Sequence, residues 1–362
     1  MSPGLWHHGC CCGGGVGELY ILTVTATGVV LARWDGTAFS NEILSPTGGI
    51  SVNSRVRICY SGYDSVLRFV YRRTDTSKLW YGEGTPGSWT YAALGDGTYG
   101  DLVVYGLGCA RGRILVWTST GIRREESAGS WVLDTPSYEM IGTNSAGAGI
   151  SADFGYEYPR LWIPRRDPVA PETLYANNGD LSESIASGGG YQFRYGNTAI
   201  DSAGDLWLAS CGVWDTDSDI TTVRVYKRLA ANSWDSHIVE DRSCYNDFLV
   251  DHASPFCIGP DDRLHLRYNN PNTWRYAVSE DAGATWICED IGNWDSQDHV
   301  ILLVDSVGAP AILKQTGCQW GGTPSQVELY ARSSLGVWSV VGTTDIDGID
   351  GYVNACSNWS FS

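Results

Sequence analysis

The chain has 362 residues, 44 glycines, 16 tryptophans and a formal net charge of −17. Its hydrophobic share of 43% and charged share of 18% exclude a disordered chain, and no apolar run reaches the roughly 18 to 20 residues of a membrane span. So negative a chain repels phosphates and anionic lipid, which disfavours nucleic acid and bilayers as partners and leaves sugars and other proteins.

The first seventeen residues form a leader that is unlike the rest of the chain. The leader has neither the basic nor the apolar region of a secretion signal, so we expect the protein to be made and folded in a cytoplasm. It contains the run His7-His8-Gly9-Cys10-Cys11-Cys12. One interpretation is a zinc or iron–sulfur centre, completed by another subunit, with ligands from His7, His8, Cys10 and Cys12. The other is a flexible Gly-rich peptide inserted into a partner.

Under either interpretation we expect residues 1–17 to be an attachment segment. The expected contact residues are Leu5, Trp6, Cys10, Cys11 and Cys12. The remaining cysteines are scattered without the regular pairing of a disulfide scaffold, and we interpret most of them as small buried hydrophobic side chains. They are Cys59, Cys109, Cys211, Cys244, Cys257, Cys288, Cys318 and Cys356.

A repeated unit follows the leader. Residues 199–208 and 303–313 each predict a strand, a D-S-x-G turn and a second strand, and a tryptophan stands 33 residues after the turn aspartate in both (234 minus 201, 338 minus 305). The matching turn residues along the chain are Phe39, Trp89, Trp131, Leu181, Trp234, Trp286 and Trp338. Seven units of about 40 to 53 residues, each made of four short strands, are typical of a β-propeller. Helical periodicity is almost absent.

We therefore predict an all-β, seven-bladed propeller over residues 18–362. The expected blades are residues 18–47, 48–96, 97–140, 141–188, 189–242, 243–294 and 295–345, with a closing strand in 346–362. The first unit is about twenty residues shorter than the others and lacks one strand. The tail alternates like a strand and has no unit of its own, so we expect it to pair beside residues 19–24 and close the ring.

One turn matches a known motif along its whole length. The segment Ser279-Glu280-Asp281-Ala282-Gly283-Ala284-Thr285-Trp286 fits the pattern S-x-D-x-G-x-T-W, and it resembles the Asp-box (BNR) repeat of sialidase-like propellers. The resemblance covers one repeat; other units keep fragments such as Gly87-Ser88-Trp89. It implies a structural role: the Ser279 and Asp281 side chains bind the turn backbone, Gly283 takes a positive φ, and Trp286 packs between strands.

The same resemblance raises the question of glycoside hydrolysis. Sialidases gather three arginines on a carboxylate beside a Tyr/Glu nucleophile pair, and the usual opening Arg-Ile-Pro is missing here. No convincing triad can be chosen from the arginines on the expected inner strands, which are Arg57, Arg68, Arg113, Arg160 and Arg267. We therefore expect the protein not to be an enzyme and keep a sialidase-like hydrolase as the alternative.

Two further groups are candidates for ligand binding. Trp274, Trp294 and Trp320 fall on expected loops, where they would stack on sugar rings unless they serve blade packing. The aspartates at 215, 217 and 219 alternate as at the start of a calcium loop, but the loop lacks the glycine and closing glutamate of that motif, so a solvated acidic loop is the alternative. These residues are Asp215, Asp217 and Asp219.

The expected protein is a propeller that follows a Cys/Gly-rich leader and has neither a secretion signal nor a recognisable group of catalytic residues. This arrangement is similar to that of phage tail-tip and receptor-binding proteins. This resemblance implies a structural virion component of a tail tip, baseplate or fibre, assembled in the host cytoplasm. The leader would bind other tail proteins, and the propeller would recognise a host-surface glycan or protein without a required cofactor. The alternatives are the hydrolase and a free protein-binding propeller.

Overall fold

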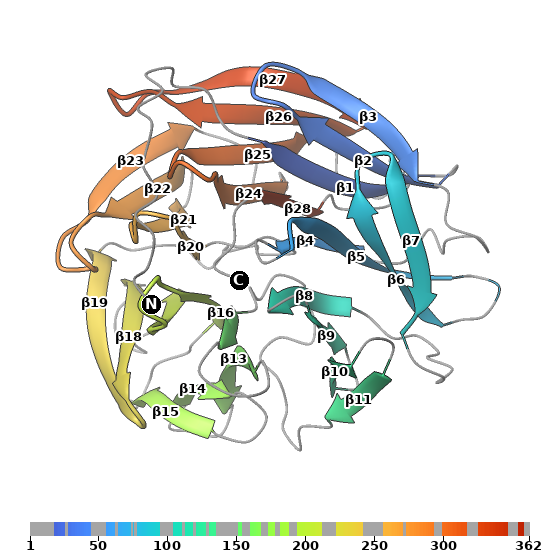
Figure 1. Cartoon of the computed structure of the whole chain (residues 1–362). Helices are drawn as coiled ribbons and strands as arrows, with labels where there is room; N and C mark the ends of the chain where they lie inside the picture. Colours follow the sequence, from blue (N-terminus) through green and yellow to red (C-terminus); the bar gives the residue numbers. More distant parts are fainter. Residues whose placement is uncertain are drawn as a thin grey trace, which may run out of the picture.

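The computed structural model describes residues 18–25, 28–44, 56–61, 64–73, 75, 78–94, 104–110, 113–118, 121–127, 130–134, 151–153, 160–167, 173–177, 182–187, 194–211, 222–241, 256–270, 273–292, 299–316, 325–346 and 354–357. These residues form β-strands and no helix, and the strands make seven four-stranded antiparallel sheets. The sheets stand side by side around a central axis (Figure 1), which is the β-propeller that the sequence predicts.

Each sheet is one blade, whose first strand lies nearest the axis and whose fourth strand forms the outer edge. Blade 1 is β28 (Asn354–Ser357), β1 (Leu19–Thr25), β2 (Gly28–Trp34) and β3 (Phe39–Leu44). Blade 2 is β4 (Arg57–Ser61), β5 (Val66–Arg72), β6 (Leu79–Thr85) and β7 (Ser88–Ala93). Blade 3 is β8 (Val104–Ala110), β9 (Arg113–Thr118), β10 (Gly121–Ser127) and β11 (Ser130–Asp134).

Blade 4 is β12 (Ser151–Asp153), β13 (Arg160–Asp167), β14 (Thr173–Asn177) and β15 (Ser182–Ser187). Blade 5 is β16 (Arg194–Ile200), β17 (Leu206–Cys211), β18 (Thr222–Ala230) and β19 (Ser233–Asp241). Blade 6 is β20 (Phe256–Ile258), β21 (Leu264–Asn270), β22 (Thr273–Ser279) and β23 (Ile287–Gly292). Blade 7 is β24 (His299–Val304), β25 (Pro310–Thr316), β26 (Ser325–Arg332) and β27 (Trp338–Ile346). The strands of each blade fall within one expected unit, except that β27 ends one residue later and β28 joins blade 1.

The innermost strands form a closed ring. In cyclic order β28, β4, β8, β12, β16, β20 and β24 each contact the next, and β24 contacts β28. Closure depends on β28, which pairs antiparallel with β1 from Leu19 opposite Ser357 to Leu22 opposite Asn354. The predicted pairing of the tail with the first unit is therefore confirmed.

Apolar side chains that alternate along the inner strands β24 and β28 join neighbouring blades. In β24, Ile301 and Leu303 pack against blade 1, whereas Val300 and Leu302 pack against blade 6. Because both faces are covered, the strand is a continuous apolar run instead of an alternating one. In β28, Ala355 packs into the cluster shared with blade 7 and Cys356 into the cluster shared with blade 2.

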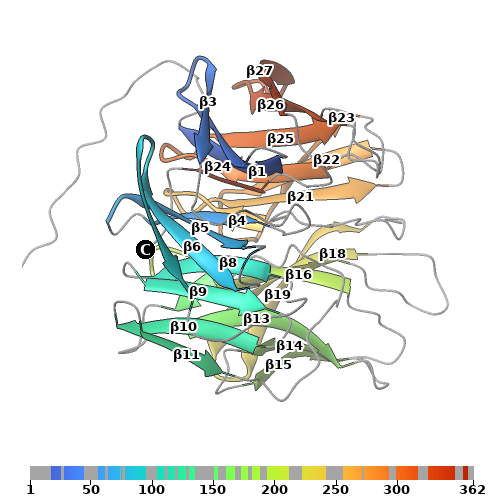
Figure 2. The same ribbon diagram turned by 90° about the vertical axis from the view of Figure 1, so that its right-hand side faces the viewer.

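The two ends of the ring differ in the length of the joins between strands. One end carries the joins between the third and fourth strands of each blade and, in blades 2 to 7, the joins between the first and second strands. The longest of these joins is residues 280–286, between β22 and β23. We call this the tight-turn end. The opposite, long-join end carries the joins between second and third strands and between blades, which include residues 135–150 and 242–255. Figure 2 shows the ring from the side, with β21 and β25 running in the same direction from the first end to the second.

Removing residues 351–362 should open the ring, because β1 loses its inner partner and exposes an unpaired strand edge. We expect the shortened protein to aggregate and to melt at a lower temperature, as measured by light scattering and calorimetry. A shorter deletion that keeps Asn354–Ser357 is the control. A soluble 1–350 chain with an unchanged melting curve would contradict the closure.

Candidate functional site

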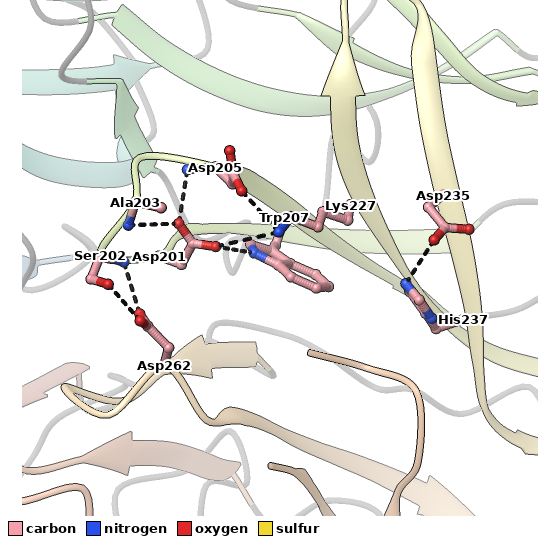
Figure 3. A network of polar contacts seen from close by, with 9 residues as sticks. All are labelled: Asp201, Ser202, Ala203, Asp205, Trp207, Lys227, Asp235, His237 and Asp262. Atoms are coloured by element: carbon pink, nitrogen blue, oxygen red, sulfur yellow. Dashed lines mark hydrogen bonds and ion pairs between the residues drawn. The ribbon is translucent and has the colours of Figure 1, made fainter. Parts of the chain in front are cut away.

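The D-S-x-G turn between β16 and β17 is built around one carboxylate (Figure 3). Asp201 Oδ1 accepts hydrogen bonds from the backbone N–H groups of Ala203 (3.1 Å) and Asp205 (2.8 Å). Its Oδ2 accepts the indole N–H of Trp207 at 2.9 Å, and Gly204 completes the turn with a φ of +85°. The aspartate and glycine thus do what the sequence motif predicts: one satisfies turn donors, the other takes the left-handed conformation.

The groups around this turn are also paired (Figure 3). Lys227 Nζ on β18 lies 2.8 Å from Asp205 Oδ2 and 5.0 Å from the centre of the Trp207 ring. From blade 6, Asp262 accepts hydrogen bonds from the backbone N–H (2.8 Å) and the hydroxyl (2.5 Å) of Ser202. The network therefore links neighbouring blades: Lys227 lies 4.0 Å from Asp201 Oδ2 as well as near Asp205, and Asp262 is held by hydrogen bonds from Ser202.

Blade 7 repeats the turn, and blade 6 modifies it. In blade 7, Asp305 Oδ1 accepts the N–H groups of Val307 (2.9 Å) and Ala309 (2.8 Å). In blade 6, Gly259 stands in place of the aspartate; a Cβ there would lie 2.8 Å from Asp261 Oδ1 and 3.2 Å from His265 Nε2. The blade 6 turn thus has no carboxylate at its first position. Asp261 accepts the N–H of Arg263 at 3.3 Å within the turn, and Asp262, at φ +60°, binds the turn of blade 5.

The turn from Ser279 to Trp286 has the hydrogen bonds that its residue types predict. The Ser279 hydroxyl donates to Asp281 Oδ1 (2.9 Å) and accepts the N–H of Gly283 (2.8 Å). Asp281 accepts both the N–H (2.8 Å) and the hydroxyl (2.6 Å) of Thr285, and these donors lower the pKa of its carboxyl. Gly283 has a φ of +86°, and Trp286 donates to its carbonyl at 3.1 Å while packing between blades 5 and 6.

Side chains on the outermost strand of one blade contact the turn between the third and fourth strands of the next blade. Glu42 on β3 accepts the N–H of Gly87 and the indole N–H of Trp89, both at 3.1 Å. His237 on β19 packs against Gly283, where an added Cβ would lie 3.1 Å from the imidazole ring. Glu289 on β23 packs against Gly336, where an added Cβ would lie 2.7 Å from Oε1. The turn glycines, all with positive φ, are Gly87, Gly283 and Gly336. All three glycines thus supply the backbone conformation of the turn, and Gly283 and Gly336 also leave room for the neighbouring side chain.

Ion pairs join blades 4 to 7 through the same strands, and sequence reasoning missed them. Glu183 on β15 accepts two hydrogen bonds from the Arg228 guanidinium, at 2.6 and 2.8 Å. Arg332 binds Glu289 of blade 6 in the same bidentate way, and Arg275 Nη1 lies 3.0 Å from Glu240 Oε1 of blade 5. The sequence signal would be a glutamate on the fourth strand of one unit and an arginine on the third strand of the next.

The inner-strand arginines have structural surroundings where their side chains are described. Arg68 binds Asp64 at 2.5 Å and lies 3.4 Å from Glu83, and the Arg267 guanidinium lies 5.1 Å from the centre of the Trp274 ring. Arg57 donates to the carbonyl of Val56 at 2.9 Å. Arg113 and Arg160 begin β9 and β13, and their side chains lie outside the described part.

A buried polar pair lies between blades 6 and 7. Nδ1 of His265 is 2.6 Å from the hydroxyl of Tyr276, and both side chains are 1% exposed. Burial lowers the pKa of His265 to about 3, with further lowering by the charges of Arg263 and Arg332. Burial also raises the pKa of Tyr276 well above its ordinary value. The pair is therefore neutral at physiological pH and packs as part of the core.

One predicted stacking residue is corrected by the structure. Trp274 is not on a loop: β21 and β22 extend until Asn270 pairs with Thr273, so Trp274 lies in a strand. Its side chain is 1% exposed in the cluster between blades 6 and 7, and no ring face is left for a sugar. Trp274 is thus one of the tryptophans that serve blade packing.

The other predicted binding residues lie outside the described residues, but their joins can be placed. Trp294 falls in the join between β23 and β24, and Trp320 in the join between β25 and β26. The join between β17 and β18 contains Asp215, Asp217 and Asp219. All three joins attach to the long-join end. Within the described part of the chain, no group of three or more His, Cys, Asp or Glu side chains could hold a metal ion.

The leader residues also lie outside the described part, including Leu5, Trp6, His7, His8 and Cys10 to Cys12. The leader meets the ring at Glu18, directly before β1, and β1 starts beside the end of β28. Both chain connections of the ring, at Glu18 and Ser357, are therefore at the tight-turn end. No helix in the described residues is long and apolar enough to cross a membrane.

Comparison with known proteins supports the fold and goes no further. The structure is similar to a quinonprotein alcohol dehydrogenase-like protein from Bacteroides thetaiotaomicron, with a TM-score of 0.53 and 10% identity over 92% of this chain and 77% of that chain. It is also similar to the Aleuria aurantia lectin, with a TM-score of 0.47 and 14% identity over 84% of this chain and 98% of the lectin. No family model matches the chain, and no curated protein matches it in sequence. The similarity to the dehydrogenase-like protein supports the β-propeller fold and leaves the activity open.

Replacing Asp281 by alanine should lower the melting temperature by about 2–4 °C, because three donors of its turn lose their acceptor. Glu280→Gln in the same turn is the control, since that side chain makes a surface ion pair with Arg263. Equal melting temperatures for Asp281→Ala and the wild type would show that the carboxylate does not hold the turn.

The buried His265 should make stability depend on pH. Its pKa in the folded protein, about 3, is below the ordinary value of 6.5, so the unfolded chain binds a proton that the folded chain does not. The stabilisation is present above pH 6.5 and is lost as pH falls toward 3, at up to ~1.4 kcal/mol per pH unit. Urea unfolding at several pH values in this range gives the free energy of unfolding, which should depend less steeply on pH in His265→Gln than in the wild type. The same pH dependence in both proteins would refute the assignment.

Proposed function

We propose that this chain is a structural, receptor-binding component of a phage tail, belonging to a tail tip, baseplate or fibre. The proposal is carried by the opposite placement of the chain connections and the long joins. Glu18 and Ser357 lie at the tight-turn end, whereas every join between blades attaches to the long-join end. A partner that binds residues 1–17 is attached through the tight-turn end, which leaves the long-join end to face a host surface.

The chemistry of the long joins supports recognition at that end. Trp294 and Trp320 supply aromatic rings to two of the joins, and Asp215, Asp217 and Asp219 supply carboxylates that would suit a calcium ion to a third. A net charge of −17 disfavours phosphate-rich ligands. We infer that the ligand is a neutral or cationic glycan or a protein on the host surface.

A sialidase-like hydrolase is the second candidate, favoured by the resemblance of the Ser279–Trp286 turn. Against it, Arg68 is already bound by Asp64 and Glu83 and offers little charge to a substrate carboxylate. Incubation of the purified chain with a fluorogenic sialoside separates the two candidates. Hydrolysis that is lost in Arg57→Ala or Arg267→Ala would favour the enzyme, and no turnover is expected from a receptor-binding protein.

Removing residues 1–17 should separate folding from assembly. The strands of blade 1 start at Leu19, so the truncated ring should keep the melting temperature of the full chain. It should fail to join the tail particle, as measured by immunoblotting of purified particles. The double variant Leu5→Ala/Trp6→Ala tests whether the two apolar side chains carry the attachment.

Elemental analysis of the assembled particle tests the metal interpretation of the leader. Zinc or iron in proportion to this chain is expected if Cys10 and Cys12 are ligands, with His7 and His8 as further candidates. Neither metal is expected if the leader is a peptide inserted into its partner. Normal incorporation of the truncated chain would exclude the leader as the attachment segment.

A further inference from the structure

One cysteine at the centre of the ring is oxidised. Cys59 on β4 is disulfide-bonded, whereas Cys257, Cys288 and Cys356 are free thiols, in keeping with the expectation that most cysteines pack as small hydrophobic groups. Ile58 and Tyr60, on either side of Cys59, pack into the cluster shared with blade 1. Because side chains alternate along a strand, Cys59 faces the other way, toward blade 3.

The register of β5 leads to the same orientation. Val70 packs into the cluster between blades 2 and 3 and is the cross-strand partner of Arg57, two residues before Cys59. Residues 57 and 59 therefore share the face of β4 that is turned toward blade 3. The innermost strand of blade 3, β8, contacts β4 directly.

Elimination among the neighbouring strands leaves one partner. The innermost strands next to β4 are β28 and β8, and the cysteine on β28, Cys356, is a free thiol. The cysteine on β8 is Cys109, two residues after Leu107, which packs into the cluster with blade 2. Alternation puts position 109 on the same face of β8 as Leu107, toward blade 2. Both positions are near the tight-turn end, since β4 ends at Ser61 and β8 at Ala110.

We propose that Cys59 and Cys109 form a disulfide that joins the innermost strands of blades 2 and 3. The bond links residues 50 apart (109 minus 59) and crosses the seam between blades 2 and 3, where Leu107 of β8 packs in one cluster with Val70 of β5. It therefore adds a covalent connection to a seam that is otherwise packed by apolar side chains. This inference does not depend on the proposed tail function.

The chemistry requires an oxidant outside the chain. Two thiols lose two protons and two electrons to form the sulfur–sulfur bond, and a small disulfide such as oxidised glutathione takes them up and becomes two thiols. A reducing cytoplasm keeps such thiols reduced. The bond should therefore form after the protein leaves the cell that makes it.

The test uses the full chain and mass spectrometry. The chain is isolated with its thiols reduced, oxidised with oxidised glutathione, alkylated without further reduction and digested. We expect a cross-linked peptide pair containing Cys59 and Cys109, lighter by two hydrogens than the separate peptides. Cys109→Ala should free Cys59 for alkylation, whereas the matched control Cys356→Ala should keep the cross-link.

A thermal measurement provides a second test without relying on one variant. Reduction should lower the melting temperature of the wild type by about 3–5 °C and leave the Cys59→Ala/Cys109→Ala chain unchanged. A cross-link from Cys59 to any other cysteine, such as one of Cys10 to Cys12, would overturn the proposal. Complete alkylation of Cys59 after oxidation would overturn it as well.

Discussion

The closing pair of strands is the constraint on which the rest of this structure depends. Blade 1 packs one face against blade 7 and the other against blade 2, so an open ring would leave apolar surface and a strand edge in water. Closure comes from four residues at the far end of the chain, Asn354 to Ser357, paired with β1. Ala355 and Cys356 then pack to opposite sides, so one short strand completes the cores shared with blades 7 and 2.

The same pairing determines at which end of the ring the chain enters and leaves. Because an antiparallel partner of β1 must end where β1 begins, both chain connections come to the tight-turn end. Turn aspartates, left-handed glycines and inter-blade carboxylates stiffen this end, as in the contact of Asp262 with Ser202. The opposite end carries the longest joins, and long surface connections are where proteins most often place binding residues.

The fold could be predicted from the sequence because its turns need particular residues. Asp201 and Asp305 accept hydrogen bonds from backbone N–H groups, and Gly283 takes a positive φ. Because each turn needs these residue types, they recur along the sequence at the spacing of the blades. The Glu183–Arg228 pair could not be predicted in this way, since many spacings place a glutamate and an arginine on neighbouring blades. Trp274 was misplaced because the polar residues before it look like a loop, although the two strands stay paired up to Asn270 and Thr273.

Hydroxyl-radical footprinting of the free chain and of the chain in its particle tests the central claim, attachment through one end and display of the other. At the tight-turn end, Leu335 and Val307 are 88% and 75% exposed, and near the long-join end Ile43 is 61% exposed, so all three should react in the free chain. Assembly should protect Leu335 and Val307 and leave Ile43 reactive. Protection of Ile43 with Leu335 and Val307 still reactive would contradict the proposed orientation.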